Sequence, residues 1–188
     1  MTDRELIDFL AIAEKMKCNT RHSWTSTNRK ESVAEHSWRL SLMALLLEKE
    51  IENVDFQKVI KMCIIHDLGE AVTGDIPSFL KTEQHSKEEE KAIVKLMEKL
   101  PEPQKSDMMI LFEEMEQRQT IEAKIYKALD RLEAVIQHNE APISSWLPLE
   151  YELQQQYGWE EAQVHKRLSK LRKTAKQDTL DKIKQEKQ

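Results

Sequence analysis

The chain has 188 residues, of which 39% are hydrophobic and 34% are charged, and its formal net charge is −5. This length and apolar content are typical of one domain with one sizeable core, and they exclude global disorder. An acidic chain is unsuited to coating long nucleic acid or an anionic membrane. Its three glycines cannot form a glycine-rich phosphate loop, which excludes the Rossmann and P-loop folds.

The N-terminal region and the cysteines indicate a cytoplasmic protein. No apolar run approaches the ~18 residues of a membrane span, and the first residues are acidic where a secretion signal carries basic ones. Cys18 and Cys63 lie far apart without a CxxC spacing. We therefore expect no disulfide framework, and both cysteines are predicted to be small buried hydrophobic residues.

Apolar residues recur with helical spacing along nearly the whole chain, which predicts an all-α fold. An opening helix is expected over residues 3–17, with Leu6, Phe9 and Leu10 on its apolar stripe. Residues 17–31 interrupt this periodicity with polar side chains. The sequence predicts a loop there.

Two Ser-x-x-Glu segments have the spacing of a capping box, in which each side chain bonds the backbone N–H of the other residue. Ser32 and Glu35 predict a helix that runs to about residue 50. Ser86 and Glu89 predict a second, exposed helix that stops at Pro101.

The remaining helices follow from the same periodicity. They are predicted at residues 55–66, 105–117 and 120–139, followed by a turn between Pro142 and Pro148 and by two more helical segments. The last 24 residues, 165–188, carry nine Lys or Arg against three Asp or Glu. This charge pattern predicts a solvated, partly frayed helix.

Two histidines and two aspartates occupy positions where a polar side chain needs a partner. His36 lies one turn into the helix capped by Ser32, in line with apolar positions, so it faces the interior. His66 and Asp67 end an apolar helix, and Asp130 interrupts another, where an unpaired carboxylate is costly. Each alone also fits a structural role as a hydrogen-bonded, capping or ion-paired residue. Together they form a mixed nitrogen and oxygen set that suits one divalent ion, namely Mn²⁺, Co²⁺, Fe²⁺, Ni²⁺ or Zn²⁺.

The order H…HD…D of these residues resembles the signature of the HD-domain superfamily of metal-dependent phosphohydrolases. His66-Asp-Leu-Gly-Glu70, followed by Thr73-Gly-Asp-Ile-Pro77, is similar to the HDxxE…GD[IL]P segment of its 5′-deoxynucleotidase branch. Arg21-His-Ser-Trp24 resembles the R-x-x-W element of that branch, and Glu31-Ser-Val-Ala-Glu-His36 resembles its stretch before the first ligand. The resemblance covers about residues 5–140.

The resemblance implies one compact helical HD domain over residues 1–188, with its metal site between core helices and with C-terminal helices and a basic tail after residue 140. It implies that His36, His66, Asp67 and Asp130 bind the metal. The expected reaction is hydrolysis of (deoxy)ribonucleoside 5′-monophosphates by a metal-activated water. The resemblance also suggests a homodimer, for which the apolar region 143–159 is a candidate contact.

Five further residues are candidates for the chemistry around the metal. Glu70 is expected to hold the water or relay its proton, and Asp75 to hydrogen-bond the leaving 5′-oxygen or the sugar. Without the resemblance, these two would be interpreted as a surface glutamate and a turn residue. Arg21 and Lys81 offer cations for phosphate oxygens, and Trp24 offers a ring that could wall in the sugar and base.

Other functions fit the same residues. The chain could be an HD phosphohydrolase acting on nucleoside triphosphates, alarmones or cyclic nucleotides, although such enzymes generally need more basic residues or a longer chain. It could also be a non-catalytic helical module with a structural metal, although structural zinc sites usually use cysteines. A zinc peptidase is excluded, because the chain contains neither HExxH nor HxxEH.

Overall fold

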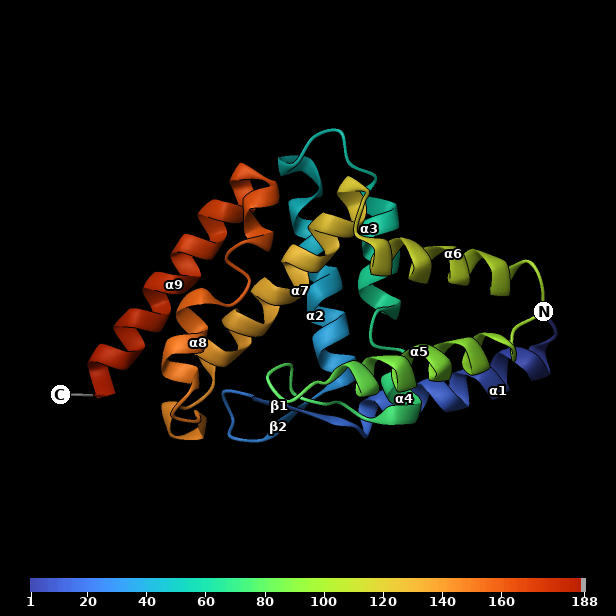
Figure 1. Cartoon of the computed structure of the whole chain (residues 1–188), viewed down its shortest axis with the longest axis horizontal. Helices are drawn as coiled ribbons and strands as arrows, with labels where there is room; N and C mark the ends of the chain where they lie inside the picture. The colour runs from blue at the N-terminus through green and yellow to red at the C-terminus, as the bar shows by residue number, and fades with distance from the viewer. Residues whose placement is uncertain (187–188) are drawn as a thin grey trace.

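The computed structural model of the chain describes residues 1–186. Its helices and strands are α1 (Asp3–Ala13), β1 (Thr20–Trp24), β2 (Lys30–Ser32), α2 (Val33–Leu47), α3 (Phe56–Ile65), α4 (Glu70–Thr73), α5 (Glu83–Met97), α6 (Gln104–Gln117), α7 (Ile121–Glu140), α8 (Glu150–Gln156) and α9 (Lys166–Glu186). In Figure 1, α7 runs diagonally through the centre beside α2 and α3, with α8 and α9 at one end of the molecule and α1, α5 and α6 at the other. The prediction of a helical fold is confirmed.

The segment predicted as a loop forms a β-hairpin instead. Strands β1 and β2 pair antiparallel, and Asn28 adopts a φ of 61° in the turn between them. The hairpin is attached to the helices at both ends, because Val33 N donates to Asn19 O and Gln137 Nε2 donates to the Trp24 carbonyl. These contacts join residues that are far apart in the sequence. The periodicity of the polar hairpin segment therefore could not predict them.

One predicted capping box is confirmed and the other is wrong. Ser32 Oγ accepts from Glu35 N at 3.2 Å, and Glu35 Oε2 accepts from Ser32 N at 2.8 Å, at the start of α2. Helix α5 begins earlier than predicted, at Glu83, with Thr82 as its N-cap, and it ends at Met97. Ser86 lies inside this helix, where its N–H donates to Thr82 O, so it cannot serve as an N-cap, and Glu89 pairs with Lys81 instead.

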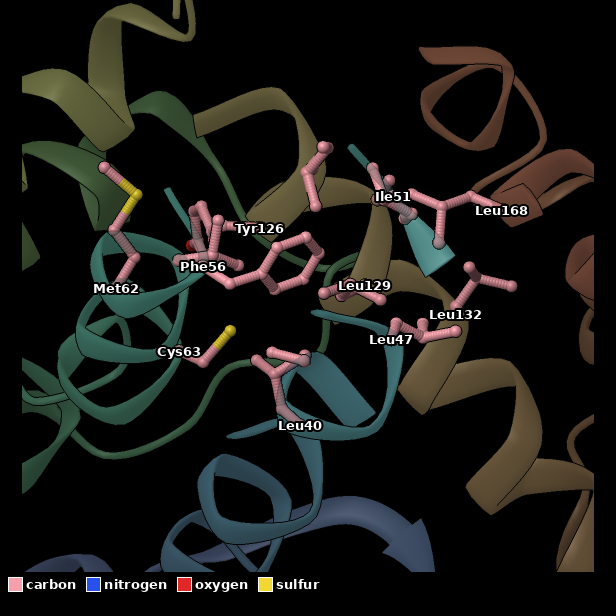
Figure 2. Close-up of a cluster of buried hydrophobic side chains, with 14 of the residues drawn as sticks. Leu40, Leu47, Ile51, Phe56, Met62, Cys63, Tyr126, Leu129, Leu132 and Leu168 are labelled. Carbon is pink, nitrogen blue, oxygen red and sulfur yellow. The ribbon is translucent and has the colours of Figure 1, made fainter. Parts of the chain in front are cut away.

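The main core lies where α2, α3 and α7 meet. Figure 2 shows side chains from these helices interlocking, among them Leu40 of α2, Cys63 of α3 and Leu129 of α7, all fully buried. Burying each such side chain contributes roughly 1.5–3 kcal/mol to folding. This contact holds together the three helices that carry the candidate metal ligands.

Two expectations about buried residues are corrected. The stripe of α1 packs through Phe9 against a second, smaller cluster, but Leu6 and Leu10 remain 40% and 54% exposed. Helix α1 lies at the edge of the molecule, where it contacts neighbours on one side only. Cys18 is exposed as well, since it follows the short turn that leaves α1, whereas Cys63 is buried.

The basic C-terminal segment is a regular, packed helix rather than a frayed one over residues 166–186. Leu168 and Ala175 of α9 are buried, and the buried Arg172 donates to the carbonyls of Tyr157 and Gln154 at the end of α8. Residues 187–188 of the predicted tail lie outside the described residues. Among residues 1–186, none of the helices has both the length and the apolar content required to cross a membrane.

Gly158 provides a test of how closely α7 and the segment after α8 approach each other. It has a φ of +71°, and an added Cβ would lie 2.6 Å from Arg131 Cβ, whereas Gly74 has a φ of +77° with nothing within 4 Å. Alanine at either position is strained by the positive φ, and the ψ of 163° at Gly74 is a conformation that residues other than glycine rarely adopt. At Gly158 overpacking adds about 1–3 kcal/mol.

We therefore expect Gly158→Ala to lower the free energy of unfolding in urea by more than Gly74→Ala does. Gly74→Ala is the comparison variant, because it also places a Cβ at a positive φ but has no atom within 4 Å. A loss in Gly158→Ala no larger than the loss in Gly74→Ala would contradict a steric cost at Arg131.

Candidate metal centre

Four potential ligands from three helical regions converge in the interior. His36 lies on α2, His66 and Asp67 follow the last residue of α3, and Asp130 lies on α7. His36 Nε2 is 3.2 Å from both His66 Nε2 and Asp130 Oδ1, and His66 Nε2 is 2.9 Å from Asp67 Oδ2. Both imidazoles are buried, so these polar atoms interact mainly with one another.

The other nitrogen of each imidazole is held by the protein. His66 Nδ1 lies 3.0 Å from the Cys63 carbonyl, which can only accept, so this nitrogen carries the proton. His36 Nδ1 lies 2.5 Å from Glu133 Oε2. Both contacts favour tautomers in which the Nε2 lone pair points into the cluster, as a metal ligand requires.

Burial and neighbouring charges shift the pKa values of the cluster in opposite directions. Burial and the nearby Arg21 lower the pKa of His36, but Glu133 and Asp130 outweigh them and raise it to about 9. Burial also raises the pKa of both aspartates. The interaction with His66 outweighs burial at Asp67, and the charge of Lys127 outweighs it at Asp130, so both pKa values lie below the usual value. Both aspartates are therefore ionised and face two imidazoles.

This donor set fits a divalent metal ion. Two Nε2 atoms 3.2 Å apart need a cation between them, which is either a proton, as the raised pKa of His36 reflects, or a metal ion that replaces it. Ligands about 2.1 Å from a metal lie roughly 3.0–3.4 Å apart at adjacent coordination positions, which is close to the 3.2 Å spacings here. His36, His66 and Asp67 together, with Asp130 beside His36, could hold one ion of the first transition series.

Arg21 lies directly beside these ligands. Its Nη1 is 3.5 Å from Asp67 Oδ2, and its Nε is 3.3 Å from Oε2 of the buried Glu31. Burial lowers the pKa of Arg21, but the charges of Asp67 and Glu31 outweigh it and raise it, so the guanidinium stays charged. Strand β1 thus places a fixed cation next to the candidate metal ligands.

Glu70 and Asp75 lie on the same side of the site. A carboxylate oxygen of Glu70 is within 4.8 Å of one of Asp67, and Glu70 Oε2 is buried without a hydrogen-bond partner. Burial, together with Asp67 and Asp75, raises the pKa of Glu70 to about 10. Burial also raises the pKa of the half-buried Asp75. A divalent cation at the neighbouring ligands would favour the ionised form of both carboxylates.

Lys81 and Trp24 are placed differently. Lys81 lines the cavity described below, but its ammonium is paired with Glu89, which partly neutralises it. Trp24 is not among the residues that line this cavity, and its ring lies 5.0 Å from Lys30 Nζ instead. The prediction for Trp24 is therefore wrong, and the aromatic rings of His22 and Phe79 line the cavity instead.

A cavity of about 1210 Å³ opens beside the cluster. His66, Asp67 and Asp130 line one part of it, together with Arg21, Glu70 and Asp75. A volume of this size accommodates a small organic ligand. Six residues expected at the site from the sequence, in addition to Lys81, therefore face one common space, whereas His36 and Trp24 are not among its lining residues.

Sequence reasoning missed three charged residues that support the ligands. Glu133 holds His36, Lys127 Nζ lies 2.6 Å from Asp130 Oδ2, and Glu31 holds Arg21. Glu133 and Lys127 are three residues from Asp130 on either side and so share its helix face. That spacing of charges on an apolar stripe was a usable signal. Glu31 begins the motif that ends at His36, but its contact with Arg21 depends on the pairing of the hairpin.

The chain is similar to several proteins of known description. The family model described as HD domain matches residues 13–172, which include all four converging side chains. The chain is 33% identical over 142 residues to the 5′-deoxynucleotidase HDDC2 of Homo sapiens, which covers 73% of this chain and 68% of that protein. It is 30% identical to the protein of the same name from Dictyostelium discoideum, with 70% and 74% covered. A crystal structure described as a predicted metal-dependent phosphohydrolase from Magnetospirillum magnetotacticum MS-1 has a TM-score of 0.82 at 27% identity, and 95% of each chain is covered.

The contact between Glu133 and His36 yields a prediction about metal affinity. Glu133→Gln keeps the size of the side chain and an acceptor for His36 Nδ1 but removes the negative charge. We expect metal affinity to fall by about 10- to 100-fold, as for other groups that orient a ligand, while Asp67→Ala should lose the metal more completely. Affinity is measured by competition with a chelator of known strength.

Glu140→Gln is the matched control, because Glu140 lies on the same helix and pairs with Arg39 at the surface. It is expected to bind metal like the unaltered protein. If Glu133→Gln also did so, Glu133 would be a packing residue only.

Proposed function

Because the chain belongs to the HD domain family, we propose that it is a metal-dependent 5′-deoxynucleotidase, which hydrolyses (deoxy)ribonucleoside 5′-monophosphates to nucleoside and inorganic phosphate. The observation that carries this proposal is the convergence of two Nε2 atoms and two carboxylates beside the buried cation of Arg21. The names of the relatives support the same activity. A monophosphate also suits the site better than longer phosphate chains, because Lys81 is already paired.

The reaction needs a polarised phosphate and an activated water. A divalent ion held by His36, His66, Asp67 and Asp130 would lower the pKa of a coordinated water toward about 7 and withdraw charge from a phosphoryl oxygen. In the hydrolysis, the water oxygen bonds to phosphorus, the bond between phosphorus and the 5′-oxygen breaks, and the leaving oxygen takes up a proton. Arg21 would bind the remaining phosphate oxygens through its planar guanidinium.

Two carboxylates are assigned to the proton transfers of this reaction. Glu70 would accept the proton of the attacking water at Oε2, which is buried without another partner and close to Asp67. Asp75 would hydrogen-bond the leaving 5′-oxygen or the sugar. Asp75 lines the same cavity as Arg21 and Glu70.

A cytoplasmic location and a homodimer complete the proposal. The unpaired cysteines Cys18 and Cys63 fit a reducing compartment. An apolar stripe on α2, formed by Trp38, Leu42, Leu45 and Leu46, supports a contact between two copies, since Trp38 is 66% exposed. In the region 143–159, Trp146 is buried within its own chain, whereas Leu147 and Leu149 are 39% and 47% exposed.

The function is tested by phosphate release from a panel of deoxyribonucleotides and ribonucleotides. The protein is first treated with a chelator, and each of several divalent metals is then restored. We expect inorganic phosphate from monophosphates with metal only, and faster turnover of dAMP than of AMP. Pyrophosphate from triphosphates, or no turnover with any metal, would contradict the proposal, whereas equal rates for dAMP and AMP would remove only the preference for deoxyribose.

The role of Glu70 predicts a loss of turnover without a loss of metal. In Glu70→Gln the side chain still hydrogen-bonds water but cannot accept its proton, so kcat is expected to fall by about 10²- to 10⁴-fold. Metal content is measured on the same sample. Glu88→Gln on the exposed face of α5 is the control and should match the unaltered enzyme. Normal turnover by Glu70→Gln would rule out this role.

The planar fork of Arg21 predicts an effect on substrate binding. Arg21→Lys keeps the positive charge beside Asp67 but loses the paired donors, and we expect KM for a monophosphate to rise about tenfold with metal content unchanged. Arg29→Lys is the control, because Arg29 pairs with Glu35 at the surface. An unaltered KM in Arg21→Lys would show that Arg21 serves only the charge balance of the site.

A further inference from the structure

A second polar cluster lines the same cavity away from the metal ligands. It consists of His22 on β1, His138 on α7 and Glu150 on α8, all of which line the cavity. His22 Nε2 is 2.9 Å from Glu150 Oε1, and His138 Nε2 is 3.3 Å from Glu150 Oε2. The two imidazole rings are stacked, with their centroids 6.3 Å apart. None of these residues takes part in the reaction steps assigned above.

The two clusters are joined by one face of α7. Asp130, Ala134 and His138 are spaced four residues apart, so they lie on one stripe of the helix, and all three line the cavity. Eight residues of helix span about 12 Å. This distance is comparable with the length of a nucleoside monophosphate from its phosphate to the far edge of its base. The small side chain of Ala134 leaves room for a sugar between the two ends.

Glu150 determines which hydrogen-bonding groups the imidazoles present. The backbone N–H of Leu147 donates to Glu150 Oε2 at 2.6 Å, which fixes the carboxylate. Burial raises the pKa of Glu150, but its contact with His138 and this backbone bond outweigh burial and hold the pKa below its usual value. Both Nε2 atoms are buried without an aligned hydrogen bond, and the Glu150 carboxylate is the charged group beside them. A proton on each Nε2 atom would face this carboxylate and leave Nδ1 of each neutral imidazole as an acceptor.

Aromatic surfaces beside this cluster suit a flat ring. Phe79 packs edge-on against His22, with ring centroids 5.5 Å apart, and both residues line the cavity. Tyr157 lines the cavity next to α8. A nucleobase could lie among these rings and present its polar edge to the two imidazoles.

We propose that His22 and His138, oriented by Glu150, form a nucleobase subsite that favours bases with an exocyclic amino group over thymine. This inference rests on the proposed nucleotidase function. Adenine, cytosine and guanine each offer amino hydrogens to an Nδ1 acceptor. Thymine offers carbonyl oxygens on both sides of its single ring N–H, and these repel the same lone pairs. Glu150 is a positioning residue, because it acts through the imidazoles.

The experiment measures kcat/KM for dAMP, dCMP and dTMP in the unaltered enzyme and in Glu150→Gln. Assays at about pH 8 lie above the usual titration range of imidazole. The glutamine can keep its oxygen on the Leu147 N–H and turn its NH₂ group toward His22 Nε2, which moves the His22 proton to Nδ1. The ratio of kcat/KM for dAMP to that for dTMP should exceed one in the unaltered enzyme, and it should fall about three- to tenfold in Glu150→Gln, as expected for one hydrogen bond.

Two controls separate base recognition from other effects. Glu152→Gln, on the exposed face of the same helix, should leave the dAMP to dTMP ratio unchanged. Deoxyribose 5-phosphate, which has no base, is assayed in parallel with every variant and reports whether the phosphate end of the site still works. If Glu150→Gln does not fold, His22→Phe is used as the test instead. This variant keeps a ring but removes Nδ1, so its dAMP to dTMP ratio should also fall.

The possible outcomes are distinct. A ratio near one in the unaltered enzyme, or a ratio that neither Glu150→Gln nor His22→Phe changes, overturns the base subsite while hydrolysis of all the monophosphates leaves the nucleotidase function intact. Failure to release phosphate from any monophosphate overturns the function itself. Inhibition constants of deoxyadenosine and thymidine give a second readout of the base subsite that does not depend on bond cleavage, and they should show the same preference.

Discussion

Two imidazole nitrogens facing each other 3.2 Å apart inside a helical core are the constraint on which the rest of the site depends. The nitrogens belong to His36 and His66, which the folding of α2 against α3 brings together. Their lone pairs repel each other unless a cation lies between them, and the buried carboxylates of Asp67 and Asp130 have the same requirement. Packing of the apolar core thus holds a set of donors whose mutual repulsion a single divalent ion would relieve.

The surrounding charges follow from this constraint. Arg21 lies against Asp67, and Glu31 compensates Arg21 from within the hairpin. On α7, Glu133 Oε2 contacts His36 Nδ1, and Lys127 Nζ donates to Asp130 Oδ2. Each of these buried groups therefore lies beside a residue of opposite charge, because an unpaired charge at this depth would cost several kcal/mol. The hairpin and α7 act as the two supports of the metal centre.

The cavity combines two kinds of polarity that correspond to the two ends of a nucleotide. Near Arg21 it offers positive charge and metal ligands, as a phosphate requires. Near His22 and Glu150 it offers aromatic faces and imidazole nitrogens, as a base requires. Helix α7 connects the ends through one stripe of side chains, so the helical rise between Asp130 and His138 sets the spacing between the metal ligands and the proposed base subsite.

The sequence by itself determined the helical class of the fold, the capping box at Ser32 and the four candidate ligands, because all of these depend on local spacing along one helix or on a short motif. Only the tertiary structure decided that residues 20–32 form a hairpin, that Glu89 binds Lys81, and that Glu133 lies 2.5 Å from His36, a residue 97 positions away. It also decided that His22, His138 and Glu150 meet in one cavity. Such contacts join segments whose separation in the chain has no periodicity, and their geometry is set by how the helices pack, which local propensity does not encode.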